Sequence, residues 1–483
     1  MSENSRAALA LSRTISMPKN FLGKKTDYPV REIMERARRG RKSIYPFSNE
    51  KSRFSIYGAS MEHSGKKFFT LDNIVITPPQ FTPKRLEKAI ELIGREPIYH
   101  DVDLSSQIGG FKTKLPLVQS SMGSQDDWNK VAPFAAKACA ESGIIAGIGE
   151  NITTTWGYSS RVNASQPSFY DRSISYLENT TEDYGGLIIQ QNEEDAYDEL
   201  WNRVYSDKKF DEYIQKGMIA FEIKGGQGAK AGMGGEKIVD RATALRLKQK
   251  YTIYPDPEHV IADSYERHSA PDIFTEEILE NRIKKLKNDY PRVKIWFKTG
   301  PYRDLGEVIR IAADAGADNI TIDGKEGGTG MSPSVALNDV GIPTISCMKA
   351  IASAREKGIT VSMISSGRMT GGGDMVKSIA LGASGIAMGR PFLVASYAYS
   401  HAEHFIEREL YNYAILKNIS SRIAKPDKRS ITFVKNMIES IETEAKLLIA
   451  SVGKYKASDL SREDLGTGMR ELSSLLGIKY IYE

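Results

Sequence analysis

The feature that most constrains the fold is a series of eight short apolar runs separated by segments with helical periodicity. The runs span 115–121, 144–149, 186–191, 218–224, 294–299, 318–323, 361–366 and 385–389. Several are apolar at nearly every position, as expected of strands buried on both faces of a parallel sheet. Amphipathic segments such as 126–143 and 302–317 lie between them. A strand–helix unit repeated eight times predicts an α/β protein with a closed (β/α)8 TIM barrel.

A doubly wound open sheet is the alternative that the sequence leaves open. Its best support is the stretch "AGIGEN" at 146–151, because glycines after a strand are typical of dinucleotide-binding turns. A full dinucleotide fingerprint would place another glycine at position 152, where the chain has Ile152. The barrel is therefore the favoured prediction.

The chain divides into three predicted parts. Residues 1–70 show no clear period and carry 15 Lys/Arg against 6 Asp/Glu, so we expect a basic N-terminal extension that wraps a larger domain. The barrel is expected over 71–400, with a long inserted loop region at 225–293 after the fourth strand. Residues 401–483 are expected to form a charged helical C-terminal tail. Long loops at the C-terminal face of a barrel are where sites are built.

Composition narrows the class of protein. The net charge is only +5, so the basic N-terminal part is interpreted as solvated surface rather than a nucleic-acid arm. No apolar run approaches the length needed to span a bilayer. The two cysteines, Cys139 and Cys347, do not resemble a secreted disulfide framework. We expect a cytoplasmic protein, although residues 5–19 have the Arg, Ser and Ala content of a transit peptide.

Polar residues and glycines follow directly after the predicted strands, at the face of a barrel where catalysis occurs. Ser366, Gly367 and Arg368 follow the seventh strand, and Gly389 and Arg390 follow the eighth. Backbone amides of these two loops, with a nearby helix N-terminus, form the usual phosphate site of barrels. One such loop would be explained by a tight turn, whereas two adjacent loops with arginines favour phosphate binding.

Two further features suggest an anionic ligand. The stretch "IKGGQGAKAGMGGEK" at 223–237 combines six glycines with three lysines. Glycine is costly to order, so such a cluster indicates a tight turn or a backbone that approaches a ligand closely. Lys298 stands within an apolar strand, and lysine is rarely buried without a partner. Its side chain either snorkels to solvent or provides a cation beside the N1–C2=O edge of a flavin.

Five motifs, taken in order along the predicted barrel, carry a family resemblance. They are "IKGGQGAKAG", "DIFTEE", "IWFKTG", "DGKEGGTGMSP" and "SSGRMTGGGDMVKSIALGASGIAMGRPFLV". Together they resemble the FMN-binding synthase domain of glutamate synthase over about 115–400. The upstream "HDVDLSSQIGGFKTKLPLVQSSMG" is similar to the lead-in strand of FMN-dependent barrels more widely. The resemblance implies FMN as the cofactor.

The resemblance also implies roles for individual residues toward the cofactor. Ser121 and Met122 are expected to lie under the isoalloxazine ring, and Lys298 to touch its pyrimidine end. The ribityl or phosphate side is expected to be lined by Gly327, Gly328 and Thr329. The phosphate is expected to be held by Ser366, Gly367, Arg368, Gly389 and Arg390.

Three residues are implied in substrate binding and catalysis. Gln227 is expected near the flavin, and Lys230 is expected to bind the carboxylate of 2-oxoglutarate. Glu150 matches the acidic residue that follows the second strand in the family, and it is expected to orient an imine or an amine.

The sequence departs from the family pattern in three places. The segment that carries a substrate-binding glutamine is missing or replaced by Glu236, whose carboxylate would repel a dicarboxylate substrate. No cysteine follows the eighth strand, where the family binds a [3Fe–4S] cluster, so no iron–sulfur cluster ligated by this chain is expected. Met1 is followed by Ser2, so no N-terminal glutaminase nucleophile is expected.

The resulting expectation is an FMN-dependent oxidoreductase acting on a small α-keto, α-imino or α-amino acid. Conversion of 2-oxoglutarate to glutamate is its narrowest form. The alternatives are a flavin barrel without net redox change, such as an isomerase, and a barrel that binds a phosphorylated ligand without flavin. Expected partners are the small-molecule substrate, an electron-donor or ammonia-supplying protein and further copies of the chain. Neither nucleic acid, membrane nor a metal ion is expected.

Overall fold

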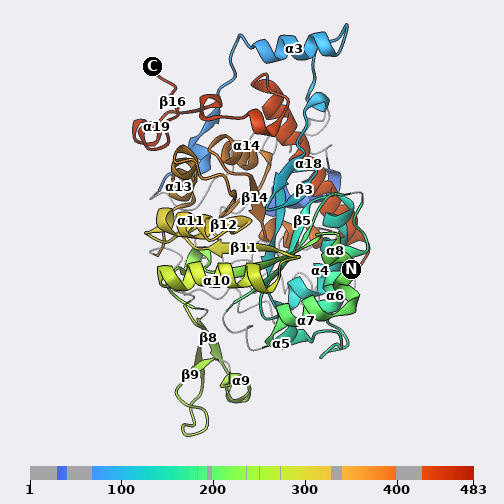
Figure 1. Ribbon diagram of the computed structural model, residues 1–483, viewed down its shortest axis with the longest axis vertical. Helices are drawn as coiled ribbons and strands as arrows, with labels where there is room; N and C mark the ends of the chain where they lie inside the picture. The colour runs from blue at the N-terminus through green and yellow to red at the C-terminus, as the bar shows by residue number, and fades with distance from the viewer. Residues whose placement is uncertain are drawn as a thin grey trace, which may run out of the picture.

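The described part of the chain forms a closed barrel of eight parallel strands. A computed structural model describes residues 30–40, 68–181, 183–192, 198–234, 236–249, 251–271, 274–327, 340–398 and 427–483. The strand order is β11-β12-β13-β14-β4-β5-β6-β7, and β7 pairs with β11 to close the ring (Figure 1). The strands are β4 (Leu117–Met122), β5 (Ile145–Ile148), β6 (Leu187–Gln191), β7 (Ile219–Gly225), β11 (Lys294–Thr299), β12 (Asn319–Asp323), β13 (Ser362–Ser366) and β14 (Gly385–Met388).

Each of these strands overlaps one of the eight predicted apolar runs. The TIM barrel is therefore confirmed, and the open doubly wound sheet is wrong. Helices cover the outside of the barrel. They are α4 (Asp126–Glu141), α5 (Ile152–Trp156), α6 (Phe169–Leu177), α7 (Leu200–Ser206), α8 (Lys208–Gln215), α10 (Glu276–Asp289), α11 (Leu305–Asp314), α13 (Thr344–Glu356), α14 (Gly372–Ala380) and α15 (Arg390–Ser396).

Local sequence signals explain where several helices begin and which face they bury. The hydroxyl of Thr275 accepts a hydrogen bond from the amide of Ile278 and so caps α10, as is typical of a threonine N-cap. In α11, Leu305, Ile309 and Ala312 are buried. Their spacing of three and four residues forms an apolar stripe that faces the sheet.

The amino-terminal end of the barrel is closed by apolar packing. A hairpin of β2 (Ser106–Ile108) and β3 (Phe111–Thr113) inserts Ile108 and Phe111 among inward-facing side chains of the strands. Trp296 lies in the same cluster, and its indole nitrogen donates a hydrogen bond to the carbonyl of Gly109 at 3.0 Å. Apolar side chains therefore fill this end of the barrel.

The predicted loop region 225–293 contains a small sheet of its own. The strands β8 (Glu236–Val239), β9 (Thr252–Tyr254) and β10 (Tyr265–His268) are antiparallel, in the order β8-β10-β9. With α9 (Arg241–Leu247) they form an excursion that projects from the barrel in Figure 1. The region ends in α10, which returns to the barrel wall.

Segments from both ends of the chain pack together against the barrel. The helix α2 (Val30–Arg39) lies against α18 (Arg429–Ser451), and α18 also packs on α4, α14 and α15. The guanidinium of Arg36 contacts the carboxylate of Glu444 at 2.8 Å. The tail contains strands as well as helices. They are β15 (Leu465–Thr467) and β16 (Lys479–Tyr480), which form a sheet with β1 (Val75–Ile76). The helix α19 (Arg470–Leu476) lies between β15 and β16 in the chain.

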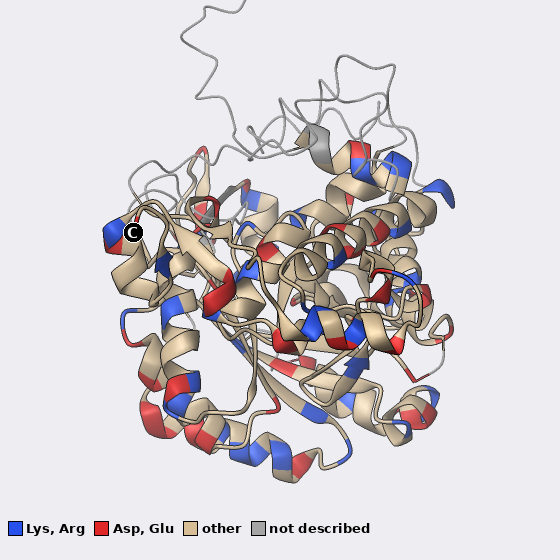
Figure 2. Cartoon of the chain, turned by 90° about the horizontal axis from the view of Figure 1, so that it is seen from above, with Lys and Arg blue, Asp and Glu red and all other residues tan. Residues whose placement is uncertain are grey.

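The surface of the described chain is mixed in charge. Acidic and basic residues alternate along the outer helices in Figure 2. The helix α3 (Pro83–Glu91) differs from the others because it stands away from the body of the molecule and exposes Leu86 and Ile90. Among the described residues, no helix combines the length and the apolar character needed to cross a membrane.

Candidate active site at the carboxyl ends of the strands

The glycine-rich loop after β7 is fixed by close backbone packing. A Cβ atom on Gly228 would lie 2.3 Å from the carbonyl oxygen of Gly324 and 2.7 Å from the Cα atom of Gly327. The amide of Gly228 donates a hydrogen bond to Oδ2 of Asp323 at 3.0 Å. The glycine at position 228 therefore allows the loop after β7 to lie directly on the loop after β12.

Lys298 is buried inside the barrel, as expected from its apolar strand. The residue is 7% exposed, and its ammonium lies 3.5 Å from Oδ2 of Asp323. The other carboxylate oxygen of Asp323 accepts a hydrogen bond from the hydroxyl of Ser366 at 2.8 Å. The structure thus brings together two predicted site residues, Lys298 and Ser366, through an aspartate that the sequence did not single out.

A second buried carboxylate, that of Glu222 on β7, lies deeper in the barrel. It accepts hydrogen bonds from Ser121 at 3.2 Å, from Gln190 at 2.6 Å and from Thr321 at 2.9 Å. Burial raises the pKa of Glu222, while the nearby charge of Lys298 opposes that rise. Ser121, which was predicted to lie near the cofactor ring, therefore donates its hydroxyl to a buried polar cluster.

The mouth of the barrel holds an ion pair between Glu150 and Lys224. Lys224 is 4% exposed and Glu150 is 19% exposed at the side chain. Burial would raise the pKa of Glu150, but the ammonium groups of Lys224 and Lys230 outweigh it and lower this pKa to about 2. The structure thus brings the predicted residues Glu150 and Lys230 within electrostatic reach of one another, and Glu150 is an anion at neutral pH.

A buried arginine supports the loop after β4. The guanidinium of Arg172 donates hydrogen bonds to the carbonyl of Met122 at 3.0 Å, to that of Gly123 at 3.4 Å and to Oδ1 of Asn129 at 3.3 Å. Burial lowers the pKa of Arg172 to about 9. The carbonyl of Met122 also accepts from the amide of Gly149 at 3.1 Å, so the backbone at this predicted site residue is held from two sides.

The two predicted phosphate loops differ in how they are built. Gly367 and Arg368, directly after β13, have positive φ angles of 126° and 61°, so the backbone adopts a left-handed conformation at both residues. Gly389 precedes α15, and a Cβ atom there would lie 3.4 Å from the sulfur of Met122. Arg390 is the first residue of α15 and is exposed.

Segments from both termini brace the loop after β13. The first amide of α14, at Gly372, donates to the carboxylate of Glu444 at 2.7 Å, so this helix terminus is bound by a side chain of α18. Arg36 of α2 donates to the carbonyl of Thr370 at 3.0 Å. The predicted extension and tail therefore hold a loop of the candidate site.

The remaining predicted residues are only partly described. Gln227 lies directly before the short 3-10 helix Gly228–Lys230. Gly327 ends a described segment, where its amide donates to the carbonyl of Gly324 at 2.8 Å. Gly328 and Thr329 lie outside the described residues. Glu236 begins β8, opposite His268 in the excursion.

Sequence reasoning assigned no site role to three charged residues, although it counted Lys224 among the lysines of the glycine-rich stretch. Glu222 and Lys224 are two residues apart in β7, so both side chains point into the barrel. Charged residues at alternate positions of an otherwise apolar strand were the signal that would have identified them. Asp323 ends β12, and a charged residue at the carboxyl end of a barrel strand was a comparable signal.

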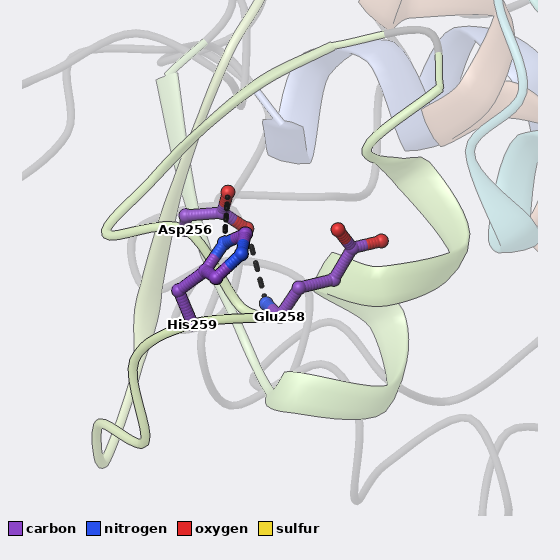
Figure 3. Close-up of side chains that lie close together, drawn as sticks. All are labelled: Asp256, Glu258 and His259. Carbon is purple, nitrogen blue, oxygen red and sulfur yellow. Dashed lines mark hydrogen bonds and ion pairs between the residues drawn. The ribbon is translucent and has the colours of Figure 1, made fainter.

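One cluster on the excursion has the composition of a metal site. Asp256, Glu258 and His259 place potential ligand atoms within 4.8 Å of one another, and Figure 3 shows Asp256 and His259 directed toward each other. The ammonium of Lys248 contacts both carboxylates, at 2.7 Å from Asp256 and 2.7 Å from Glu258. A cation of the chain itself therefore already contacts both carboxylates and partly neutralises them, and we assign no metal to the cluster.

The packing of the glycine-rich loop leads to a testable prediction. Gly228→Ala should destabilise the protein by about 1–3 kcal/mol, because the new methyl group would meet backbone atoms that cannot rotate away. Gly306→Ala is the control, since a Cβ atom at Gly306 in α11 meets nothing within 4 Å. That control should be neutral or slightly stabilising. Denaturant unfolding of the two variants measures the difference, and equal stabilities would contradict the described loop packing.

Comparison with known proteins decides the family. Residues 209–454, about half of the chain, match the family described as a conserved region in glutamate synthase. The chain belongs to the glutamate synthase family. The family predicted from the motifs is therefore confirmed.

Individual relatives of this glutamate synthase family member match the chain over only part of their own length. The archaeal-type glutamate synthase (NADPH) of Dehalococcoides mccartyi is 37% identical over 194 residues, which are 38% of this chain and 36% of that protein. The glutamate synthase large subunit-like protein of Rhizobium meliloti is 35% identical over 188 residues, 36% of this chain and 39% of that protein. The archaeal-type glutamate synthase (NADPH) of Thermotoga neapolitana is 29% identical over 282 residues, which are 56% of this chain and 53% of that protein. The chain thus spans about a third to a half of these curated relatives.

Solved structures resemble this family member in fold. A doubly substituted flavocytochrome b2 with pyruvate bound has a TM-score of 0.51 at 14% identity, covering 99% of this chain and 93% of that one. Another flavocytochrome b2 variant, with benzoylformate, has a TM-score of 0.50 at 15% identity, covering 84% of this chain and 78% of that one. At such low identity the likeness supports the barrel fold alone.

Proposed function

We propose that this chain is an FMN-dependent oxidoreductase of the glutamate synthase type, acting on a small α-keto, α-imino or α-amino acid. The observation that carries the proposal is the buried ammonium of Lys298, held inside the barrel 3.5 Å from Asp323 in a member of this family. A buried cation at the carboxyl end of a barrel strand suits a cofactor that gains negative charge.

The described residues fit an FMN group. The positive φ angles at Gly367 and Arg368 belong to the loop directly after β13, at the face where barrels commonly bind phosphate. Gly389 leaves its side of the mouth without a side chain, next to the sulfur of Met122. The pyrimidine end of the ring would meet Lys298, while Gly327, Gly328 and Thr329 remain the proposed lining of the ribityl side.

Bound FMN would supply a hydride from its N5 to an electrophilic carbon of the substrate. The chain's own residues provide charge and orientation. Lys298 stabilises negative charge at the pyrimidine end, and Lys230 binds a substrate carboxylate. Because the pKa of Glu150 is about 2, its carboxylate accepts hydrogen bonds from an imine or amine at neutral pH and does not act as an acid. Gln227 remains a proposed contact of the flavin.

The finer parts of the proposal concern substrate and partners. We propose a relative of 2-oxoglutarate, and not necessarily 2-oxoglutarate itself, because Glu236 replaces the substrate-binding glutamine of the family pattern and its carboxylate would disfavour a second substrate carboxylate at its own position. An electron-donor or ammonia-supplying protein, a homo-oligomeric state, a cytoplasmic location and the lack of an iron–sulfur cluster ligated by this chain are parts of the same proposal.

Anaerobic titration of the purified protein tests the reaction class. The flavin is first reduced with NAD(P)H or dithionite, and candidate substrates are then added. Reoxidation by 2-oxoglutarate with ammonium, followed at the flavin absorption band, is the expected result. A flavin that is never reoxidised by a keto or imino acid but is needed for isomerisation would favour the non-redox alternative.

Lys230→Ala should leave the FMN content intact and raise KM by about tenfold to a hundredfold, the effect of losing one charge-assisted contact. Lys248→Ala, on the excursion, is the matched control and should leave KM unchanged. Steady-state kinetics and the flavin absorption of both variants give the measurement. Loss of flavin in Lys230→Ala would assign this loop to the cofactor instead of the substrate.

A further inference from the structure

One buried carboxylate connects three separate parts of the candidate site. Oδ2 of Asp323 accepts from the amide of Gly228 at 3.0 Å and lies 3.5 Å from the ammonium of Lys298. Oδ1 accepts from the hydroxyl of Ser366 at 2.8 Å. Asp323 is 4% exposed, so these contacts are shielded from water and correspondingly strong.

We propose that Asp323 is a positioning residue that couples the glycine-rich loop to the cation of the cofactor site. Its carboxylate holds the loop in place through the hydrogen bond from the amide of Gly228, and it orients the ammonium of Lys298 at the same time. The part of the inference that concerns the cofactor rests on the proposed function, whereas the part that concerns the loop does not.

Glycines let the loop pack closely around this carboxylate. A Cβ atom on Gly228 would meet the carbonyl oxygen of Gly324, and a Cβ atom on Gly327 would lie 2.2 Å from Oδ1 of Asp323. Lys230 follows Gly228 by two residues and lowers the pKa of Glu150 across the mouth. A shift of the loop away from Asp323 would therefore move the ammonium that we assign to substrate binding.

The charge of Asp323 has a second consequence. Its carboxylate partly neutralises Lys298, so the field that the cation exerts on a bound flavin is weaker than that of an unpaired ammonium. Asp323→Asn keeps the size of the side chain and removes the negative charge. Asp323→Asn should therefore raise the reduction potential of the flavin, whereas removal of the Lys298 ammonium should lower it. A purely structural role for Asp323 gives no reason for a rise.

Hydrogen exchange on the protein as purified tests the loop part. Asp323→Ala should speed amide exchange in the peptide that contains Gly228 by about tenfold or more, because the acceptor of that amide is lost. Asp323→Asn keeps an amide oxygen as acceptor and should give a smaller increase. Asp318→Asn is the matched control, because Asp318 precedes the same strand at its opposite end and pairs with Lys287 at 2.9 Å.

Two results would overturn the inference. Loop exchange in Asp323→Ala that equals exchange in Asp318→Asn would show that the carboxylate does not seat the loop. A flavin potential in Asp323→Asn that falls or stays unchanged would show that it does not tune the cation. If the purified protein holds no flavin, the proposed function fails, and the exchange experiment alone decides whether Asp323 positions the loop.

Discussion

Glu150→Gln should destabilise the protein by about 3 kcal/mol, because it leaves the ammonium of Lys224 buried beside a neutral amide. Lys224 is only 4% exposed, so water cannot replace the lost partner. The double variant Glu150→Gln, Lys224→Met should recover part of the loss, since it removes both charges together. Denaturant unfolding at neutral pH of the wild type, both single variants and the double variant measures the coupling.

The ion pair between Glu150 and Lys224 predicts that the stability of the protein depends on pH. The pKa of Glu150 in the folded protein, about 2, lies below the value of about 4.3 for an unperturbed glutamate. The stabilisation is therefore fully present above the unfolded pKa and is lost as the pH falls from about 4 toward 2. Glu150→Gln should lack this part of the acid dependence.

A surface pair provides the control for this experiment. Lys216 and Glu212 form an ion pair in which the side chains are 58% and 68% exposed. Glu212→Gln should leave stability nearly unchanged, because exposed pairs are screened by solvent. An effect of Glu150→Gln no larger than that of Glu212→Gln would contradict the buried ion pair.

Lys298→Met should weaken FMN binding by about tenfold or more, the effect of losing one buried charge-assisted contact. It should also lower the flavin reduction potential, because negative charge on the ring would lose its nearest cation. The substitution removes the charge and keeps most of the side-chain volume. It also leaves Glu222 and Asp323 without their shared cation, so the pKa of Glu222 should rise further.

The control for Lys298→Met lies on the same strand. Lys294 begins β11 at the opposite end of the barrel, where its ammonium lies 4.5 Å from the ring centre of Phe111. Lys294→Met should leave the flavin potential unchanged. Equilibrium titration with FMN and a spectroscopic redox titration compare the two variants. Equal potentials in both would place the flavin, or its negative charge, away from Lys298.

The barrel was predictable from the sequence because its strands are buried on both faces and therefore read as continuous apolar runs. The excursion within 225–293 was predicted only as a long loop region. Its strands have three or four residues each and include exposed positions, so they carry no comparable signal. The strands β15 and β16 within the predicted helical tail have only three and two residues.

The sequence predicted Lys298 and Ser366 near the carboxyl ends of their strands, and β11 and β13 end at Thr299 and Ser366. The partners of those residues were not predictable in the same way. Asp323 meets Gly228 and Ser366 only because the ends of the neighbouring strands β12 and β13 and the loop after β7 converge at the barrel mouth. The pairing of Glu150 with Lys224 likewise depends on which strand ends are neighbours in the closed barrel.

Acid release of the cofactor from the purified chain tests the central claim, that the mouth of this barrel binds FMN. The supernatant of the denatured protein is chromatographed against FMN and FAD standards, and the flavin is quantified relative to the protein. The account predicts FMN in a ratio near one to each barrel. Recovery of FAD, or of no flavin even after incubation of the protein with FMN, would contradict it.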